Sequence, residues 1–420
     1  MKIKSILGTY IPNNIRFGKK YSDFLKELNE LNELNTTKKE AWRLKKLNEI
    51  LEYSYKNVPY YKNLFDNNNI NLPLNNLAEI KKIPYLTKEK IRSNYKELIT
   101  LKDIPSYEVN TGGSTGTPLK LKKSKLNGIK EAVFLDYYMQ ELGLKGFKVK
   151  KAILRGPIPK TGISEKIGRQ LILSSYLITD ENLKFYIKEL EKFNPEIFHV
   201  YPSSIYSLAK LIEKYNLQIK LPNLKVIFAS SETFTKKQKD LVFKIFNCEI
   251  FDLYGNTETS VQAINLYPDK GYKFNDFYSY VEIVDGEIIS TSFNDLTMPL
   301  IRYKTGDEIE YIDEDNFIIK GRVQDYIYGK NNEKFPVVGI IFGQHFDSFK
   351  KMTNFQIIQD KIGEITFVIE GEKLTSEEEN DIINTLKKAG NNSLEVTIKY
   401  IDKIKRTNRG KYKFLIQNIK

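Results

Sequence analysis

Residues 248–255, "CEIFDLYG", form a short apolar run that ends in turn residues. Three further runs of the same kind lie upstream, at residues 150–156, 197–202 and 224–232. Short apolar runs bounded by turn residues are typical of buried β-strands, and stretches between these runs, such as residues 180–193, have helical periodicity. This alternation of strands and helices predicts an α/β fold with mixed β-sheets that are covered by helices.

The sequence on either side of this alternation follows other patterns. Apolar residues recur at three- and four-residue steps over residues 20–65, and we expect residues 1–100 to form a mainly helical lead-in. Residues 281–293 and 307–321 have the pattern of β-hairpins, and the first of them has an Asp-Gly pair at its turn.

A polar break, "GKNNEKFP" at residues 329–336, precedes the C-terminal part of the chain. Beyond it, strand patterns flank a helical stretch at residues 376–390, and a basic tail follows. We therefore predict a large N-terminal domain at residues 1–325 and a small, mobile α+β domain at residues 326–420.

The composition limits the class of protein. The 420 residues are 41% hydrophobic and 28% charged, which is typical of a globular chain that is long enough for two domains. The single cysteine, Cys248, excludes an internal disulfide bond. No run of about 18 apolar residues is present, so we expect no transmembrane segment. The N-terminal sequence lacks the apolar core and cleavage site of a secretory signal, and we expect a cytoplasmic protein.

The charge balance is basic. Lysine and arginine number 66 against 53 aspartates and glutamates, a formal net charge of +13. A nucleic-acid-binding protein concentrates such an excess in a patch or stripe, whereas here lysines and acidic residues are mixed along the whole chain. Nucleic acid is therefore not an expected partner, while peripheral association with an anionic membrane surface stays open.

The segment "TGGSTGTP", residues 111–118, combines three glycines with several hydroxyl side chains. Glycine lets the backbone approach a ligand closely, and successive N–H groups in such a turn can bind a phosphate. An ordinary surface turn is the alternative explanation, and the Gly-Lys-Ser/Thr of a Walker A loop does not follow.

Four more segments place polar residues after strand-like runs, where open α/β sheets bind ligands. They are "DLYGNTET" (252–259), "MPLIRYKTGDEIEY" (298–311), "GRVQDYI" (321–327) and "KIKRTNRGKYKFLI" (403–416). Each alone has an ordinary explanation as a turn, a hairpin or a solvated tail. Their joint occurrence, in this order, favours a functional site.

With these motifs in this order, the sequence resembles the adenylate-forming superfamily, and within it the phenylacetate–CoA ligase-like branch that includes the CapK group of capsule biosynthesis. The likeness covers about residues 45–415, and "YSYKNVPYYKNLF" (53–65) resembles this branch in particular. The motifs that carry it are "TGGSTGTP" for the phosphate loop, "YGNTE" for adenine and magnesium, "YKTGD" for the ribose, "GRVQD" for the hinge and "RTNRGK" for the C-terminal Gly-Lys.

The resemblance implies a two-step reaction. A carboxylate attacks the α-phosphate of ATP, pyrophosphate leaves, and the acyl group of the adenylate passes to an acceptor. A carboxylate is already an anionic nucleophile near neutral pH, so the first step needs charge neutralisation and alignment rather than a general base. The implied catalytic residues are Lys411 and Thr257 at the α-phosphate, and Glu258 as the ligand of Mg²⁺.

The resemblance also implies a nucleotide site. The glycine-rich loop would hold the β- and γ-phosphates, Tyr254 and the segment at 230–232 would line the adenine, Asp307 would accept from the ribose hydroxyls, and Arg322 would reach ribose or phosphate. The complete set is Gly112, Gly113, Ser114, Thr115, Gly116, Thr117, Ser230, Ser231, Glu232, Tyr254, Gly255, Asp307 and Arg322.

The expected cofactors are ATP and Mg²⁺, and the expected partners are a small carboxylic acid and an acceptor. The CapK group implies an amine or sugar acceptor in surface polysaccharide synthesis, whereas phenylacetate ligases imply coenzyme A, and this choice stays open. At the hinge, Gln324 stands where the family commonly has an acidic residue and Asp325 follows, so the pivot residue also stays open. Cys248 and His199 are interpreted as strand residues rather than as a nucleophile and a metal ligand.

Overall fold

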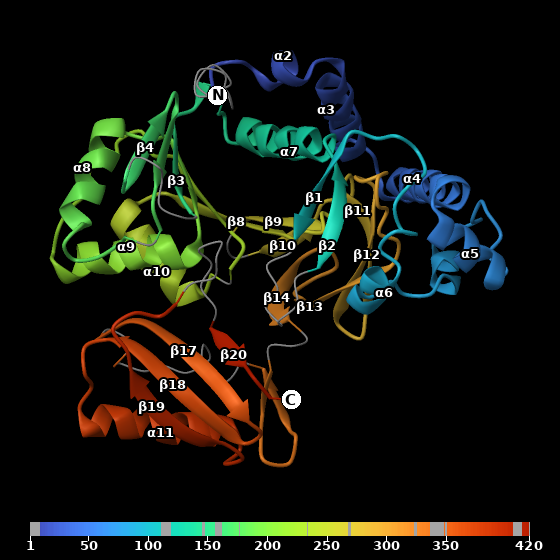
Figure 1. The fold of residues 1–420 in the computed structure, drawn as a ribbon. Helices are drawn as coiled ribbons and strands as arrows, with labels where there is room; N and C mark the ends of the chain where they lie inside the picture. The colour runs from blue at the N-terminus through green and yellow to red at the C-terminus, as the bar shows by residue number, and fades with distance from the viewer. Residues whose placement is uncertain are drawn as a thin grey trace.

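Helices and strands alternate in the structure, a computed structural model, and are arranged in a larger and a smaller unit (Figure 1). The structure describes residues 9–110, 119–144, 148–155, 162–175, 177–232, 234–267, 270–322, 326–336, 348, 351–405 and 414–419. Within these residues the strands form a 12-stranded sheet, a four-stranded sheet and two small two-stranded sheets. Helices cover the largest sheet, and the predicted α/β class is confirmed.

The N-terminal part is helical. Its elements are α2 (Asn13–Phe17), α3 (Lys19–Asn32), α4 (Thr36–Asn57), α5 (Pro59–Asn67), the 3₁₀ helix η1 (Leu77–Lys82) and α6 (Lys88–Ser93). The side chain of Asn35 accepts a hydrogen bond from the Lys38 N–H and caps α4. Thr87 caps α6 in the same way, since its side chain accepts a hydrogen bond from the Lys90 N–H. A small antiparallel sheet of β1 (Ser106–Asn110) and β2 (Lys120–Ser124) follows.

Five parallel strands form one half of the large sheet, in the order β5, β3, β6, β7, β8. Their bounds are Gln170–Leu173, Lys151–Leu154, Ile197–Val200, Val226–Ser230 and Glu249–Gly255, with β4 (Ser164–Ile167) antiparallel at the edge. The helices of this half are α7 (Asn127–Glu141), α8 (Leu183–Phe193), α9 (Pro202–Lys214) and α10 (Lys236–Phe246). Leu208 of α9 packs with Val200 and Ile227 in the buried core between helices and sheet. Burial of such side chains supplies most of the stability of this half.

The other half of the large sheet is antiparallel. It contains β9 (Gln262–Tyr267), β10 (Gly271–Phe274), β11 (Ser279–Val284), β12 (Glu287–Ser292), β13 (Tyr303–Tyr311) and β14 (Phe317–Arg322). Asp285 and Gly286 join β11 to β12 with φ angles of 53° and 81°. These positive values are those of the tight hairpin turn that an Asp-Gly pair predicts.

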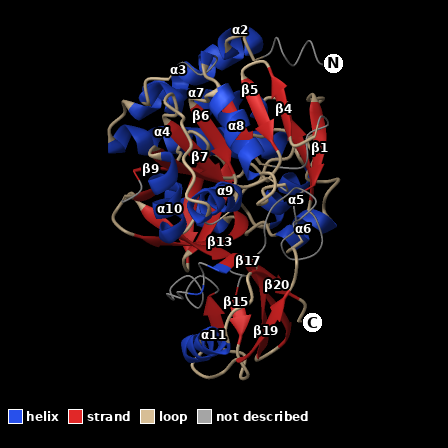
Figure 2. Cartoon of the chain, turned by 90° about the vertical axis from the view of Figure 1, so that its left-hand side faces the viewer, coloured by secondary structure: helices blue, strands red, loops and turns tan. Residues whose placement is uncertain are grey.

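The C-terminal part has its own sheet and core. The sheet order is β19, β18, β17, β20, with bounds Glu395–Tyr400, Glu364–Gly371, Met352–Lys361 and Leu415–Gln417, and α11 (Ser376–Ala389) packs on it. A hairpin of β15 (Tyr326–Tyr328) and β16 (Lys334–Pro336) joins this unit, since Ile327 packs with Phe367 and Leu386. In Figures 1 and 2 the unit lies below the large sheet.

Several contacts connect the two units. Lys210 on α9 donates a hydrogen bond to the carbonyl of Met352, where β17 begins. Tyr326 in β15 donates to Glu308 Oε2 in β13 at 2.6 Å. The two polypeptide units are therefore in direct contact through polar groups of α9 and β13.

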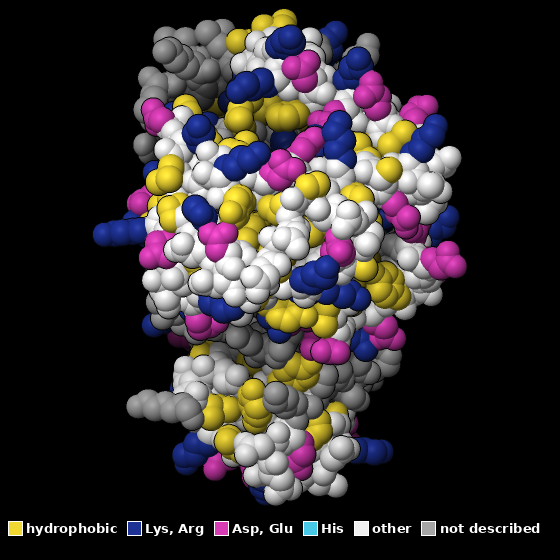
Figure 3. Space-filling model, turned by 90° about the vertical axis from the view of Figure 1, so that its right-hand side faces the viewer, with side chains coloured by type: hydrophobic (Ala, Val, Ile, Leu, Met, Phe, Trp, Pro, Cys, Tyr) yellow, Lys and Arg dark blue, Asp and Glu magenta, His cyan; other side chains and the backbone are white. Residues whose placement is uncertain are grey.

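Several strands differ from the sequence pattern. The C-terminal segment, expected as a basic tail, contains β20, which pairs in parallel with β17. The hairpin of β4 and β5 was not predicted, because its strands are only four residues long and β4 is mainly polar. None of the described helices is both long and apolar enough to cross a bilayer. On the face shown in Figure 3, basic and acidic side chains are interspersed, as expected for a solvated surface.

Candidate active site

The candidate site begins where parallel strands end. β7 ends at Ser230 and β8 at Gly255, and Ser230 lies opposite Leu253 in the parallel register. The predicted segments 230–232 and 254–258 therefore leave the sheet at the same edge. Carboxyl ends of neighbouring parallel strands are where open α/β sheets usually bind ligands.

A hydrogen bond joins the predicted adenine and ribose residues. Tyr254 Oη donates to Asp307 Oδ2 at 2.7 Å, and the Asp307 side chain is buried. The Asp307 N–H in turn donates to Thr305 Oγ1, which fixes the backbone of the Thr-Gly-Asp turn. Asp307 pairs with Arg322 in the register of β13 and β14, so the backbones of these two predicted residues are neighbours. The side chain of Arg322 lies outside the described part of the structure.

A second hydrogen bond reaches the predicted magnesium residue. Tyr303 Oη donates to Glu258 Oε1 at 3.0 Å. The turn that carries Glu258 is held by Asn256, whose Oδ1 accepts from the Ser260 N–H at 2.9 Å and whose Nδ2 donates to Ser260 Oγ at 2.7 Å. Thr257 lies in this same turn. The turn is therefore fixed by its own side chains, and Glu258 is oriented by a tyrosine from β13.

The donor set at Glu258 fits a divalent cation that is bound mainly by phosphate. One carboxylate oxygen accepts from Tyr303, and a carboxylate has a second oxygen that can ligate a cation. The described residues contain no group of three or more potential metal ligands. Mg²⁺ commonly binds through one or two carboxylates together with phosphates and water, and a single carboxylate is sufficient for that mode.

The segment that follows β7 has a role that its motif does not predict. Ser231 has a φ angle of +74°, so the backbone turns sharply after Ser230. Glu232 Oε2 then accepts a hydrogen bond from the Ser203 N–H at 2.9 Å, at the first turn of α9. A carboxylate at a helix N-terminus is stabilising, so Glu232 fixes α9 relative to this edge.

Two carboxylates near the site, one buried and one half-buried, were missed by sequence reasoning. Asp252 in β8 is buried, and burial raises the pKa of its carboxyl despite the Lys239 ammonium 3.5 Å away. Glu131 on α7 accepts from Tyr278 Oη at 2.6 Å, and burial raises the pKa of this carboxyl as well. Glu131 lies on a helix of mixed polarity, and nothing in the surrounding sequence indicates that its side chain lies near the site.

Arg302, which stands close to Asp307 in the ribose motif, is engaged elsewhere. Its Nε and Nη2 donate to both oxygens of Glu282 at 2.9 and 2.8 Å, and Nη1 donates to the carbonyls of Lys81 and Ile83. The ion pair is buried, with 4% and 7% of the two side chains exposed. Arg302 therefore joins β13 to the helical lead-in and is not available to a nucleotide.

His199 lies in the middle of β6, as its apolar neighbours predict. Burial and the nearby Arg155 guanidinium hold the pKa of this imidazole well below its usual range, so it is neutral. Arg155 follows β3 and lies over the ring of Tyr201, at 5.2 Å from its centroid. Cys248 lies directly before β8 and not in a strand as expected, and its burial raises the pKa of its thiol to about 12 and leaves it unreactive.

Several predicted residues lie outside the described residues. They are Gly112, Gly113, Ser114, Thr115, Gly116 and Thr117 of the glycine-rich loop, Lys411, and the hinge pair Gln324 and Asp325. The flanks of the loop are described: Asn110 and Lys120 are paired across β1 and β2, so the chain leaves and re-enters this hairpin at adjacent positions. The strand after Lys411 is also described, since Leu415 pairs with Ile357.

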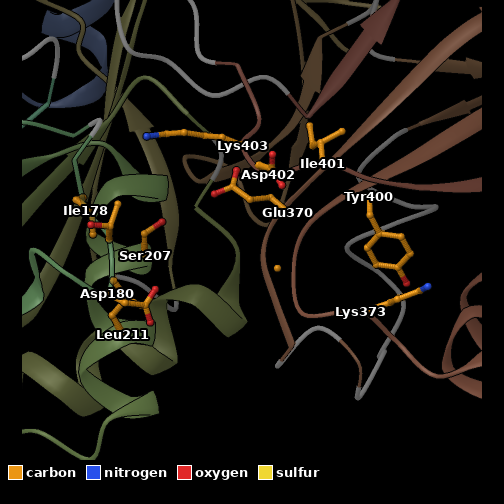
Figure 4. Close-up of a pocket in the computed structure, with 12 residues that line it drawn as sticks. Ile178, Asp180, Ser207, Leu211, Glu370, Lys373, Tyr400, Ile401, Asp402 and Lys403 are labelled. Carbon is orange, nitrogen blue, oxygen red and sulfur yellow. The ribbon is translucent and has the colours of Figure 1, made fainter.

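A pocket of about 600 Å³ lies between the two units. Figure 4 shows Asp180, Ser207 and Leu211 of the N-terminal unit on one side and Glu370 and Lys403 of the C-terminal unit on the other. The side chain of Lys403 extends across the gap toward the N-terminal unit (Figure 4). Both units therefore contribute to the wall of this pocket.

Comparison with known proteins gives consistent matches. A family model described as the CapK C-terminal domain matches residues 330–418. Protein CapK of Staphylococcus aureus is 28% identical over 429 residues, which cover 96% of this chain and 94% of that protein. A phenylacetate-coenzyme A ligase of Aromatoleum evansii is 23% identical over 292 residues, which cover 64% of this chain and 65% of that protein.

Among solved structures, 2-hydroxyisobutyryl-CoA ligase in its postadenylation state has a TM-score of 0.68 to this chain at 13% identity. The superposition covers 91% of this chain and 90% of that one. The two chains therefore share one fold over both units.

Proposed function

The chain belongs to the adenylate-forming superfamily of AMP-forming ligases, and from this premise we propose that it activates a carboxylic acid with ATP and transfers the acyl group to an acceptor. One observation carries the proposal. Residues 254–258 and residues 303–307, which are distant in the sequence, lie side by side. Tyr254 contacts Asp307 at 2.7 Å, and Glu258 contacts Tyr303 at 3.0 Å. These are the segments that the superfamily uses for adenine, magnesium and ribose.

In the proposed first step, the residues align the reactants and balance charge. Asp307 accepts hydrogen bonds from the ribose hydroxyls, and the ring of Tyr254 lies against the adenine. Glu258 would hold Mg²⁺, which supplies positive charge at the phosphates of ATP. Thr257 donates a hydrogen bond to the α-phosphate, where the carboxylate oxygen forms a new bond and the bond to pyrophosphate breaks.

Residues 112–117 and Lys411 complete the proposal. The glycine-rich loop would hold the departing β- and γ-phosphates by backbone N–H groups. Lys411 would place a compact positive charge at the α-phosphate, where negative charge develops in the transition state. We further propose that residues 326–420 turn relative to residues 1–325, so that Lys411 withdraws before the acceptor attacks the acyl carbon.

For the acceptor we propose an amine or hydroxyl of a sugar in surface polysaccharide synthesis. The support is the extent of the likeness to CapK, which covers 96% of this chain against 64% for the phenylacetate ligase. Coenzyme A is the second candidate, because those ligases and 2-hydroxyisobutyryl-CoA ligase are named for it. The proposed setting is cytoplasmic.

The first test is exchange of labelled pyrophosphate into ATP, measured across a panel of aryl, fatty and amino acids. Exchange that depends on one class of acid, and that falls in Asp307→Ala at ATP concentrations below saturation, is the expected result. The control is Asp313→Ala, an exposed aspartate at the β13–β14 turn, which should keep full exchange. Absence of exchange with every acid, from protein that binds ATP, would reject the proposed activity.

The second test addresses the acceptor. The acid found by exchange is incubated with ATP and either coenzyme A or a set of amino sugars, and the products are identified by mass. Amide or ester formation with a sugar supports the proposal, and a thioester alone replaces it with the CoA ligase activity.

A further inference from the structure

A second pocket lies in the N-terminal unit, away from the residues assigned to the nucleotide. Its volume is about 310 Å³, and its lining comes from α3, α4, α7 and the segments around Phe277 and Phe293. The walls are mainly apolar and include Phe24, Trp42, Ile50, Leu126, Phe277 and Phe293. A volume near the lower end of the range for ligand pockets fits a small molecule.

The aromatic walls are ordered by contacts with one another. The rings of Trp42 and Phe293 meet edge to face, with centroids 6.0 Å apart. Those of Phe24 and Phe277 have the same arrangement at 6.4 Å. Such paired rings hold their positions without a ligand, so the pocket is already formed.

Lys130 brings a positive charge into this apolar pocket. Its Nζ donates to the carbonyl of Phe293 at 2.9 Å and lies 5.1 and 5.3 Å from the ring centroids of Phe24 and Phe277. Among the described residues no carboxylate lies within 4.0 Å of this ammonium, which has two further N–H donors. Burial lowers the pKa of Lys130 to about 8, so the group is mostly charged at pH 7.

The other charges at the pocket are already paired. Lys46 contacts Glu27 at 2.7 Å and Glu49 at 3.2 Å, and all three line the pocket. Lys46 therefore neutralises both carboxylates, whereas Lys130 contacts a backbone carbonyl and two aromatic rings. A cation in an apolar cavity attracts a ligand that brings a negative charge and an apolar body.

We propose that this pocket binds a small amphiphilic anion, such as a short fatty or aryl carboxylate, with its charged group at Lys130 and its apolar body among the aromatic walls. The site is distinct from the proposed active site, and the inference does not depend on the proposed function. None of the predicted catalytic or nucleotide-binding residues lines it.

The pocket is nevertheless connected to the turn that carries Glu258. Ser124, in its wall, donates through its N–H to Asp295 Oδ2 at 3.0 Å. Asn127 donates to the same oxygen at 2.7 Å and to Thr259 Oγ1 at 3.4 Å, and Thr259 follows Glu258. The side chains of Asp295 and Asn127 therefore connect the wall of the pocket to this turn.

The test uses the full chain at pH 7 and the fluorescent anion 1-anilinonaphthalene-8-sulfonate. We expect saturable binding that octanoate displaces and that octylamine and Mg²⁺–ATP do not. Lys130→Met keeps the apolar stem and removes the charge, and it should weaken binding at least about tenfold, the lower end of the range for a charged hydrogen bond. Equal affinity in this variant, or displacement by ATP, would overturn the proposal.

A pair of tryptophan variants keeps the test independent of the buried lysine. Leu296→Trp adds volume at the mouth of the pocket and should abolish binding, whereas Leu101→Trp, at a side chain that is 76% exposed outside the pocket, should not. Thermal unfolding of each variant shows that it is folded. Asp307→Ala should bind the probe normally, so a failed active-site proposal and a failed pocket proposal give different results. Unchanged binding in Leu296→Trp would place the probe elsewhere and reject this site.

Discussion

Tyr254 and Asp307 meet at 2.7 Å although β14, β10 and β9 lie between their strands in the sheet order. In a flat sheet four strand spacings of about 4.8 Å would separate β8 from β13 by roughly 19 Å. The sheet must therefore curve, and it does so around β10, where the register with β9 shifts and only Tyr272 pairs with Phe317 of β14. This curvature brings the two motifs into one site.

The first prediction concerns this pair. Asp307→Ala removes the acceptor for the ribose hydroxyls and should weaken the binding of AMP more than it slows the bound complex. Tyr254→Phe keeps the ring and removes only the hydroxyl that orients Asp307, so it should cost about 1 kcal/mol of AMP binding. Calorimetric titration measures the affinity of both variants for AMP. Unchanged affinity in folded Asp307→Ala would show that Asp307 does not bind the ribose.

The second prediction concerns Glu258. Glu258→Gln keeps the shape and removes the negative charge, so exchange of pyrophosphate should fall about a hundredfold and require more Mg²⁺. Tyr303→Phe is the matched control, because it removes the 3.0 Å hydrogen bond and leaves the carboxylate. The loss of exchange activity in Tyr303→Phe should correspond to one hydrogen bond, about 1 kcal/mol. An equal Mg²⁺ dependence of wild type and Glu258→Gln would contradict a ligand role.

The third prediction concerns Lys411. Lys411→Ala should reduce adenylate formation by about 3 kcal/mol, a hundredfold or more in rate, while ATP binding changes only a few-fold. The reason is that the charge acts on the transition state rather than on bound ATP. Lys405→Ala is the control, since this exposed lysine precedes the Gly-Lys motif. Exchange within about threefold of wild type in Lys411→Ala would assign the catalytic charge to another residue.

The sequence predicts the order of elements well because their signals are local. The apolar run at 248–255 becomes β8, and the Asp-Gly pair becomes the turn between β11 and β12. Thr87, a residue type that favours helix N-caps, stands directly before α6 and caps it. Each of these depends on periodicity or backbone preference within a few residues, which a single sequence contains.

Contacts between distant segments are not predictable in this way. Glu232 at the first turn of α9 and Arg302 paired with Glu282 depend on how strands and helices pack, and neither has a signal in its own motif. β20 is missed for a related reason: three residues become a strand only because β17 offers an edge for parallel pairing.

The fourth prediction concerns pH and the contact between the units. Burial lowers the pKa of Lys210 to about 8, against about 10.5 in the unfolded chain. Between these values the unfolded state binds more protons than the folded state, so the free energy of unfolding gains a contribution that rises with pH. Below about pH 8 the cost of the buried charge is present in full.

Lys210→Met removes this titration. Relative to the variant, wild type should therefore become more stable between pH 7 and pH 10, as measured by the thermal unfolding midpoint. Lys214→Met is the control one turn further along α9, because the pKa of Lys214 is raised by its bond to Asp180 and the group stays charged over this range. A difference between wild type and Lys210→Met that is the same at pH 7 and pH 10 would contradict the lowered pKa.

The last prediction concerns motion between the units. β14 ends at Arg322 in the large sheet, and β15 begins at Tyr326, next to Ile327 in the C-terminal core. Only residues 323–325 connect the two at this point, so a rotation of the C-terminal unit would turn about them. Gln324→Pro fixes one backbone dihedral there and should impair one half-reaction much more than the other, because each half-reaction would use its own orientation. Single-turnover measurement of adenylate formation, and of acyl transfer from preformed adenylate, separates the two. Gln324→Ala keeps the backbone freedom and should leave both rates near wild type, whereas equal loss of both steps in Gln324→Pro would favour a rigid two-unit site.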